Sequence, residues 1–286
     1  MSGEVLSLAE VAEALGVHYM TAYRYVRLGQ LPATKIGSVW QVDRCDLDGY
    51  LERGSTVTSP RRRADWASRI EARLLGGDQA GAWAVIEAAL TGGIEPVEVY
   101  TEALGPALRS IGERWAKGDI DPGEEHLATA IAHRLIGRLG PRFAHRGRTR
   151  GSVVLAMPPN DRHGLGIAMV GDVFLSAGFE PIELGADVPL ASLESAIHRV
   201  DRLKAVGIGA VVSNRKHLAA AVRRARRAAG PGIPIILGGP GTNRDEAIGL
   251  GADGWAATAT DGVDMLEACL RGEKVGVRSV AATTPA

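Results

Sequence analysis

An aspartate and a histidine separated by one residue form the pair in this sequence best suited to chemistry. Asp161 and His163 lie in the stretch MPPNDRHGLG, which also contains Gly166. One ring nitrogen of such a histidine can coordinate a metal, while the carboxylate accepts a hydrogen bond from the other nitrogen and fixes the tautomer. Gly166 would let a bulky ring approach the backbone. The pattern predicts a metal or cofactor site, with a solvated loop histidine as the alternative.

Other small and polar residues follow predicted strands. The runs SVVLAM, PIELG, AVGIGAVVS and IPIILGG alternate with helical segments. Such alternation predicts a doubly wound, five-stranded parallel sheet of the flavodoxin or Rossmann type, in which ligands bind beyond the carboxyl ends of the strands. Ser213 ends the third run and Gly238–Gly239 end the fourth, so both should lie near His163. The glycine pair could equally form an ordinary strand-end turn.

The segment before the predicted sheet has a helical pattern throughout. From Asp65 to about His145 it contains four helical runs, each closed by glycine as helix C-termini tend to be. The runs are WASRIEARLLGG, AGAWAVIEAALTGG, VEVYTEALGPALRSIGERWAKG and EEHLATAIAHRLIGRLG. A four-helix bundle is the simplest interpretation.

This helical segment holds a second group of candidate ligand-binding residues. Trp115 is followed after nine residues by Glu125 and His126, and Gly118 and Pro122 interrupt the helix between them. The break would let an indole from one helix end and a Glu–His pair from the next helix start converge on one ligand face. A flat apolar surface beside two hydrogen-bonding groups suits a nucleoside. Alternatively, the tryptophan is bundle core and the pair a solvated helix start.

The N-terminal segment has the pattern of a DNA-binding domain. Ser7 is a candidate N-cap for a first helix that Gly16 ends, and a second helix is expected over roughly His18–Leu28. The run ATKIGSVWQV predicts two short strands turning at Gly37–Ser38, which would form a wing. The residues expected to contact base edges or phosphates are Tyr19, Thr21, Tyr23, Arg24, Arg27, Lys35 and Arg44. A small helical interaction domain that does not touch DNA is the alternative.

Length and composition set the remaining limits. The chain has 286 residues, a net charge of zero and no apolar run long enough for a bilayer, so we expect a soluble protein of several domains with no membrane partner. The N-terminus lacks a secretory pattern, which predicts a cytoplasmic location. Cys45 and Cys269 have no partner at metal-site spacing and are expected to be ordinary thiols. The sequence contains no hydrolase triad, phosphate-binding loop with lysine or paired zinc ligands in a suitable context, which favours a protein that is not an enzyme.

The expected organisation is multi-domain, with α and α/β parts. It comprises a winged helix-turn-helix domain over residues 1–53, a linker over 54–64, a four-helix bundle over 65–147, an α/β domain over 150–272 and a disordered tail over 273–286. A single helix-turn-helix module binds DNA weakly, so useful specificity needs several modules on repeated half-sites. We therefore expect a homo-oligomer, either a dimer or a tetramer.

Three of these motifs resemble known families. The stretches SLAEVAEALG and LPATKIGSVW resemble the MerR and excisionase-type DNA-binding family. The D-x-H-x-x-G motif, with the later serine and glycine pair, resembles the cobalamin-binding domain of methionine synthase and corrinoid proteins. This resemblance implies that His163 ligates the cobalt of cobalamin and that the nucleotide tail passes Ser213 and Gly238–Gly239. In that family the serine is usually followed by x-Leu, whereas Asn214 and Arg215 follow it here.

The tryptophan motif resembles the W-x(9)-E-H motif of the light-dependent carotenoid repressors. The resemblance implies that Trp115, Glu125 and His126 cover the adenosyl group of adenosylcobalamin, which supports an oligomer on operator DNA until visible light releases it. That family has a histidine directly after the tryptophan, and this chain has Ala116. After illumination, His126 or His133 could ligate cobalt instead, water could do so, or the pocket could hold a second chromophore such as a bilin.

The resemblance to these repressors runs from about Leu6 to Gly272 and implies a cobalamin-dependent photoreceptor that regulates transcription. Two other functions remain open. A corrinoid carrier for methyl transfer shares the bundle and the D-x-H-x-x-G sheet domain, but it gives no reason for the winged helix. A regulator whose sensor has lost cobalamin would keep the DNA-binding domain and recognise another ligand.

Overall fold

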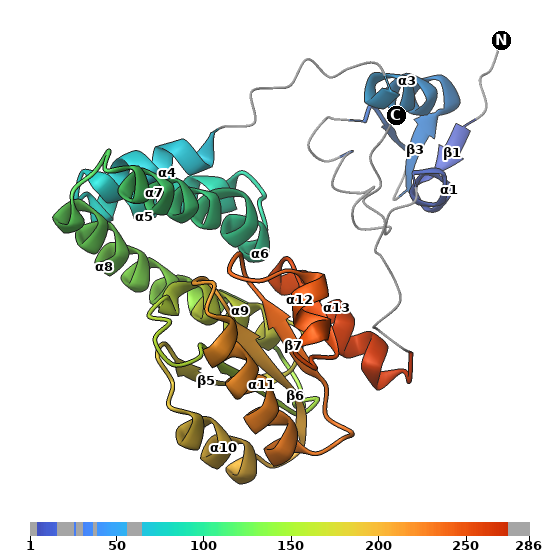
Figure 1. Cartoon of the computed structure of the whole chain (residues 1–286). Helices are drawn as coiled ribbons and strands as arrows, with labels where there is room; N and C mark the ends of the chain where they lie inside the picture. The colour runs from blue at the N-terminus through green and yellow to red at the C-terminus, as the bar shows by residue number, and fades with distance from the viewer. Residues whose placement is uncertain (1–4, 16–25, 27–30, 37–38, 56–64, 274–286) are drawn as a thin grey trace. The chain divides into compact units, whose positions relative to one another are not determined.

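The computed structural model describes residues 5–15, 26, 31–36, 39–55 and 65–273. The chain divides into two compact units, residues 1–64 and 65–286, and each is described by itself (Figure 1). Within the described residues, none of the helices combines the length and hydropathy that a bilayer crossing needs.

The N-terminal unit contains a three-stranded antiparallel sheet and two described helices. These elements are β1 (Val5–Ser7), α1 (Leu8–Ala14), β2 (Thr34–Ile36), β3 (Val39–Asp43) and α3 (Arg44–Ser55). The strand order is β1-β3-β2. Ile36 pairs with Val39, so the predicted wing hairpin is present. Its core includes the buried side chains of Leu6, Val11 and Leu47.

The start of α1 shows why a serine stands there. The Ser7 backbone N–H donates to a Glu10 carboxylate oxygen at 2.8 Å, and Ser7 Oγ accepts from the Glu10 backbone N–H at 3.4 Å. This reciprocal pair is a capping box, which satisfies backbone donors that a helix start leaves free. The predicted N-cap is confirmed. Ser7 is also the last residue of β1, where it pairs with Gln41 of β3. The sequence did not indicate strand β1.

The second unit begins with the predicted four-helix bundle. Its helices are α4 (Trp66–Leu75), α5 (Gln79–Thr91), α6 (Pro96–Glu98), the π-helix η1 (Val99–Leu104), α7 (Gly105–Lys117), α8 (Pro122–Leu139) and the short 3-10 helix η2 (Gly140–Phe143). Aspartates cap the N-termini of α4, α5 and α8, and glycines end α4, α5, α7 and α8 as predicted. The third predicted helix is α6, η1 and α7 in succession, because a π-helical turn interrupts it.

A five-stranded parallel sheet follows, as predicted. Its strands are β4 (Ser152–Ala156), β5 (Glu180–Gly185), β6 (Leu203–Gly209), β7 (Ile235–Gly238) and β8 (Gly254–Ala256), in the order β5-β4-β6-β7-β8. This is the flavodoxin-like order, in which the first strand, β4, lies between the second and the third, so that the chain proceeds in opposite directions along the sheet on the two sides of β4. Strand β6 ends at Gly209, earlier than the run AVGIGAVVS suggested, so Ser213 lies in a loop.

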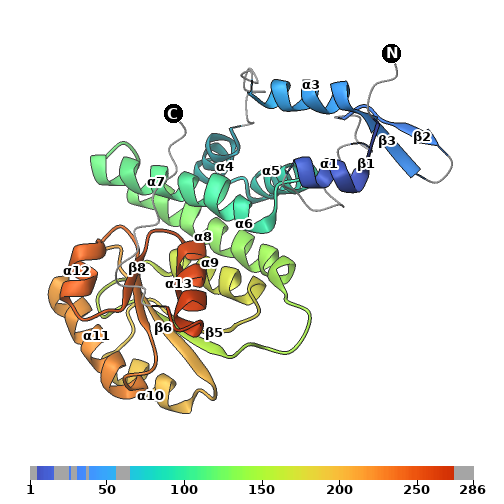
Figure 2. The ribbon, with the colours of Figure 1, turned by 90° about the vertical axis from the view of Figure 1, so that its right-hand side faces the viewer.

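Helices cover both faces of this sheet. They are α9 (Gly164–Ser176) and α13 (Ala259–Leu270) on one face, and α10 (Leu190–Arg199), α11 (Arg215–Ala229) and α12 (Arg244–Gly249) on the other. Figure 2 shows the two sets on opposite sides of the strands. The bundle shares one hydrophobic core with α9 and α13, whereas α10, α11 and α12 pack in a separate core. The two faces of the sheet are therefore distinct environments.

A buried tyrosine joins the bundle to the sheet domain. Tyr100 in η1 stacks on Phe143, with ring centroids 4.9 Å apart, and its hydroxyl donates to Asp172 Oδ2 of α9 at 2.5 Å. Glu183 of β5 lies over Gly171, where an added Cβ would fall 1.8 Å from Glu183 Oε1. Burial raises the pKa of Asp172 above its ordinary value. Partial burial also raises the pKa of Glu183 to about 7, and the charge of Asp172 adds to that shift.

This carboxylate pair predicts a pH-dependent stability. Because the folded-state pKa of Glu183 lies above its ordinary value of 4.5, the folded chain holds this proton more tightly than the unfolded chain. The contribution of this proton to the free energy of unfolding is fully present below about pH 4.5 and is lost as the pH rises to about 7. Urea unfolding at several pH values should show that the free energy of unfolding declines less between about pH 4.5 and 7 in Glu183→Gln than in the unmodified chain. Glu113→Gln, which changes an exposed glutamate of α7, should leave the decline intact, and equal declines in all three proteins would contradict this account.

Candidate functional site

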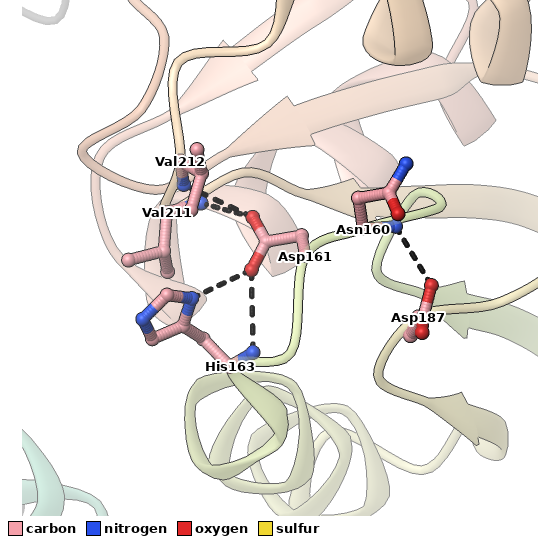
Figure 3. A network of polar contacts seen from close by, with 6 residues as sticks. All are labelled: Asn160, Asp161, His163, Asp187, Val211 and Val212. Atoms are coloured by element: carbon pink, nitrogen blue, oxygen red, sulfur yellow. Dashed lines mark hydrogen bonds and ion pairs between the residues drawn. The ribbon is translucent and has the colours of Figure 1, made fainter.

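A buried carboxylate organises the loop after β4. Asp161 is 2% exposed, and its Oδ2 accepts hydrogen bonds from the backbone N–H groups of Val211 and Val212 at 2.8 and 3.1 Å. Its Oδ1 lies 2.7 Å from His163 Nδ1 and accepts from the His163 backbone N–H at 3.2 Å (Figure 3). Burial alone would raise the pKa of Asp161, but the hydrogen bonds from Val211, Val212 and His163 bring it below its ordinary value.

The aspartate also orients the histidine. His163 stands at the N-terminus of α9 with its side chain 52% exposed, whereas the side chain of Asp161 is 3% exposed. A buried carboxylate that accepts from Nδ1 favours the tautomer whose Nε2 lone pair is free to bind a metal. Figure 3 shows the second ring nitrogen directed away from Asp161. The ring is thus held at one nitrogen and available at the other.

A second set of hydrogen bonds fixes the same loop from the side of β5. The Asn160 backbone N–H donates to Asp187 Oδ1 at 2.7 Å, and the Asp187 backbone N–H donates to the Asp161 carbonyl oxygen at 2.7 Å. Both Asn160 and Asp187 have positive φ angles, 67° and 51°, a conformation that Asn and Asp tolerate better than most residues. The Asn160 side-chain nitrogen lies 3.1 Å from His217 Nδ1 of α11. Sequence reasoning missed this support, although consecutive turn formers in PPND and GADVP mark both turns.

An apolar cavity of about 200 Å³ opens beside His163. It lies between the sheet and helices α9 and α13, and its lining includes Leu155, Met157, Gly207 and Gly209. An added Cβ at Gly207 would fall 2.6 Å from Leu155 Cδ2, and one at Gly209 would fall 2.3 Å from Met157 Sδ. Larger residues in β6 would therefore fill this slot. The glycines at positions 207 and 209 were not singled out in the sequence, although two glycines with a spacing of two in a strand indicate a close approach on one face.

The other predicted cofactor residues are distributed around this cavity. Gly166, Gly238 and Gly239 line it, as His163 does, whereas Ser213 is exposed in the loop after β6 and lies outside the lining. Among the described residues, no atom lies within 4 Å of an added Cβ at Gly166, so this position faces open space. Gly239 has φ of 102°, and a Cβ there would fall 2.4 Å from the Ala210 carbonyl oxygen. A side chain at position 239 would thus be strained whether or not a ligand binds.

The predicted cap residues lie at a break between two bundle helices. Gly118 ends α7 with φ of 78°, and Pro122 begins α8. Trp115 is in the last turn of α7 and is 50% exposed, so it is not bundle core. Glu125 and His126 are the fourth and fifth residues of α8, with a carboxylate oxygen of Glu125 3.2 Å from His126 Nδ1. The indole before this break is therefore uncovered, and a Glu–His pair follows shortly after the break in the sequence.

Only two of the predicted DNA-contacting residues fall within the described part of the chain. Lys35 of β2 is exposed, with its Nζ 5.8 Å from the centroid of the Trp40 ring. Arg44 begins α3, where its Nε donates to Asp48 Oδ1 at 3.2 Å. Lys35 thus lies in the hairpin and Arg44 directly after it, where a wing would meet a phosphate backbone. The residues outside the described part are Tyr19, Thr21, Tyr23, Arg24 and Arg27.

A single imidazole beside an apolar slot fits a metal whose other ligands arrive with a large cofactor. The helix-turn-helix domain model matches residues 5–55, and models described as B12 binding domain match residues 66–139 and 151–282. The chain is therefore a helix-turn-helix protein with B12-binding domains. The match over residues 151–282 contains the loop of Asp161 and His163.

Its relatives include a transcriptional repressor and corrinoid proteins. The HTH-type transcriptional repressor CarH of Myxococcus xanthus is 27% identical over 198 residues, which cover 68% of this chain and 64% of that repressor, less than two thirds of its length. Trimethylamine corrinoid protein 1 of Methanosarcina acetivorans is 25% identical over 198 residues, covering 68% of this chain and 91% of that protein. The structure of the monomethylamine corrinoid protein of Methanosarcina barkeri has a TM-score of 0.62 at 16% identity and covers 72% of this chain and 99% of that one. This last likeness shows the fold.

The hydrogen bonds of Asp161 predict a large stability effect for its removal. Asp161→Ala would leave two backbone N–H groups without their acceptor and the His163 ring without its anchor. We expect the free energy of unfolding to fall by about 2–4 kcal/mol, measured by urea denaturation. Asp201→Ala removes an exposed aspartate and should change it by less than about 0.5 kcal/mol. Similar values for both variants would show that the Asp161 network contributes little.

Proposed function

We propose that this protein is a light-responsive transcriptional regulator in which adenosylcobalamin controls oligomerisation and operator binding. The observation that carries the proposal is the Asp161–His163 pair beside an apolar slot, in a chain that also holds a helix-turn-helix domain. A carrier has no use for the DNA-binding domain. A regulator needs both a ligand site and a means of reaching DNA.

In this proposal the sheet domain holds the cofactor from below. His163 Nε2 ligates cobalt, and Asp161 keeps the ring in the required tautomer. The slot beside Gly207 and Gly209 takes the nucleotide tail, because its walls are apolar and glycine keeps it open. Ser213 would contact the tail only if its loop moved toward the cavity.

The bundle covers the opposite side of the cofactor. When bound, adenosylcobalamin supplies a cobalt–carbon bond that visible light can break. Trp115 packs against the adenosyl group, and Glu125 and His126 offer hydrogen bonds to it. The exposed indole supports this role, since an apolar surface of this size is favourably covered by a ligand.

A junction between bundle and sheet domain would transmit the change. Tyr100 and Asp172 hold η1 against α9, the helix whose N-terminus carries His163. Contacts on the two sides of the cofactor can therefore bias how the bundle packs on the sheet domain, and such a packed interface switches between discrete arrangements. We infer that this bias sets the oligomeric state, and through it the number of helix-turn-helix domains that reach an operator together.

A corrinoid carrier for methyl transfer is the second candidate. The likeness to trimethylamine corrinoid protein 1 over 91% of that protein favours it for the bundle and sheet domain. The two functions differ in what the bound cofactor does. Light-dependent operator binding identifies the regulator, whereas methyl exchange with a partner methyltransferase identifies the carrier.

The regulator is tested by its response to light. The full chain, reconstituted with adenosylcobalamin in the dark, should form a dimer or tetramer on size-exclusion chromatography and retain promoter DNA. Illumination should change the absorbance spectrum, reduce the oligomer and release the DNA. Unchanged oligomer and DNA binding in light, despite a changed spectrum, would refute light control.

The cobalt ligand is tested by His163→Ala. We expect loss of the spectral signature of histidine on cobalt and at least about tenfold weaker corrinoid uptake, because a ligand bond and its hydrogen-bonded support are removed together. His198→Ala changes an exposed histidine of α10 and serves as the matched control. An unaltered spectrum in His163→Ala would remove the basis of the proposed sensor.

The upper side is tested by Trp115→Ala. Loss of one aromatic contact should weaken adenosylcobalamin binding by about tenfold while hydroxocobalamin, which lacks the adenosyl group, binds as before. Ile248→Ala truncates an exposed apolar side chain of α12 and should affect neither ligand. Equal weakening of both cobalamins by Trp115→Ala would place the indole elsewhere.

A further inference from the structure

A strongly basic stretch of the chain contains part of the helical layer on one face of the sheet domain. Between His198 and Ala229 the chain has nine lysines and arginines and one acidic residue, Asp201, although its overall net charge is zero. This stretch includes the end of α10 and all of α11. Local charge of this kind creates a positive potential that net charge conceals.

Part of this charge is neutralised within the fold. Arg224 pairs with Glu194 of α10, and Arg226 pairs with Asp253. Glu194 also lies near Arg227, but its carboxylate is already bonded to Arg224. These pairs hold α11 against α10 and against the segment before β8. Other lysines and arginines of the stretch are not part of them.

Several of the remaining cations are exposed on the two neighbouring helices or directly after them. Lys216, Arg223 and Arg227 are exposed, and none of them has an ion pair in the described structure. Their spacing of seven and four residues places them on one side of α11, along about 16 Å of helix. Arg199 ends α10 and Arg202 lies in the turn that follows; both are exposed, and within the described residues they donate to uncharged oxygens, those of Ser195 and Thr149. We call these five cations the basic face; α10 and α11 lie side by side in both views (Figures 1 and 2).

The chemistry of the basic face favours a polyanion over a protein. Protein interfaces have an apolar centre, and the large exposed hydrophobic residues of the described chain all lie outside α10 and α11. The residues between the cations along the stripe are small, as at Ala219 and Ala220. Closely spaced cations without apolar neighbours suit a phosphate backbone, which is bound without regard to base sequence.

We propose that the basic face binds the phosphate backbone of duplex DNA as a second contact, separate from the helix-turn-helix domain. The chain already carries a domain of a DNA-binding type, so duplex DNA is the polyanion it is most often near. The basic face lies on the side of the sheet that α10, α11 and α12 cover, opposite the cavity and the bundle. Backbone binding there leaves the ligand pocket and the bundle uncovered.

The proposal is tested by the salt dependence of binding to a duplex of arbitrary sequence. With the full chain and a labelled duplex of about 40 base pairs, fluorescence anisotropy gives the slope of log affinity against log salt. Arg223→Glu/Arg227→Glu should lower the size of this slope by about 2 and weaken binding on the order of tenfold at about 100 mM salt. Arg223→Gln/Arg227→Gln should also lower the salt slope and the affinity for the duplex, but by less than the glutamate variant. The circular dichroism and melting temperature of this variant should match those of the unmodified chain, which shows that it is folded.

The matched control is Arg146→Glu/Arg148→Glu, which makes the same charge change at exposed positions between η2 and β4. Equal slopes for this control and the Arg223/Arg227 variants would overturn the proposal while leaving the helix-turn-helix domain as the DNA contact. Loss of binding to polyglutamate without loss of duplex binding would also overturn it, in favour of an acidic protein partner. If the unmodified chain binds no duplex even at low salt, both this proposal and the proposed regulator are wrong.

Discussion

The geometry of the site depends on one buried carboxylate that belongs to three strand ends at once. Asp161 follows β4, accepts from the amides of Val211 and Val212 after β6, and its carbonyl oxygen accepts from Asp187 after β5. A carboxylate with this many donors stays ionised and cannot leave without exposing unpaired amides. The hydrogen bonds to Asp161 fix the position of His163, so the imidazole is oriented before any ligand binds.

Preorganisation on the sheet contrasts with openness above it. The slot is walled by a rigid sheet and kept free by glycine, while Trp115 and His126 stand in solvent at a helix break. Ordering the lower side in advance removes part of the entropy cost of binding a large ligand. The upper side can then respond to what the ligand carries, and Tyr100 ties the bundle to the helix that begins at His163. A sensor needs this division between a fixed and a responsive side.

Much of the fold was predictable because it follows from short-range patterns. Helical runs closed by glycine predicted the bundle, and short β-rich runs predicted the wing hairpin and the parallel sheet. The fifth strand was not located because β8 has three residues, too few for a pattern. The end of β6 was misjudged because Val211 and Val212 resemble strand residues, yet their amides turn to bind Asp161. Contacts between residues 50 positions apart leave no local signal. The predicted cofactor and DNA contacts remain proposals.

The two faces of the sheet also separate two kinds of interaction. Glycines on β6 open an apolar slot on the face under α9, whereas α10, α11 and the turn between α10 and β6 present cations without ion pairs in the described structure on the other face. A helix-turn-helix domain alone gains little affinity, and most of it comes from phosphate contacts that weaken with salt. A backbone contact on the sensor, as proposed above, would raise affinity for any sequence and leave base recognition to the helix-turn-helix domain. Such a contact would act through effective concentration, because both surfaces belong to one chain. The ligand-dependent step would then govern how many such chains act together.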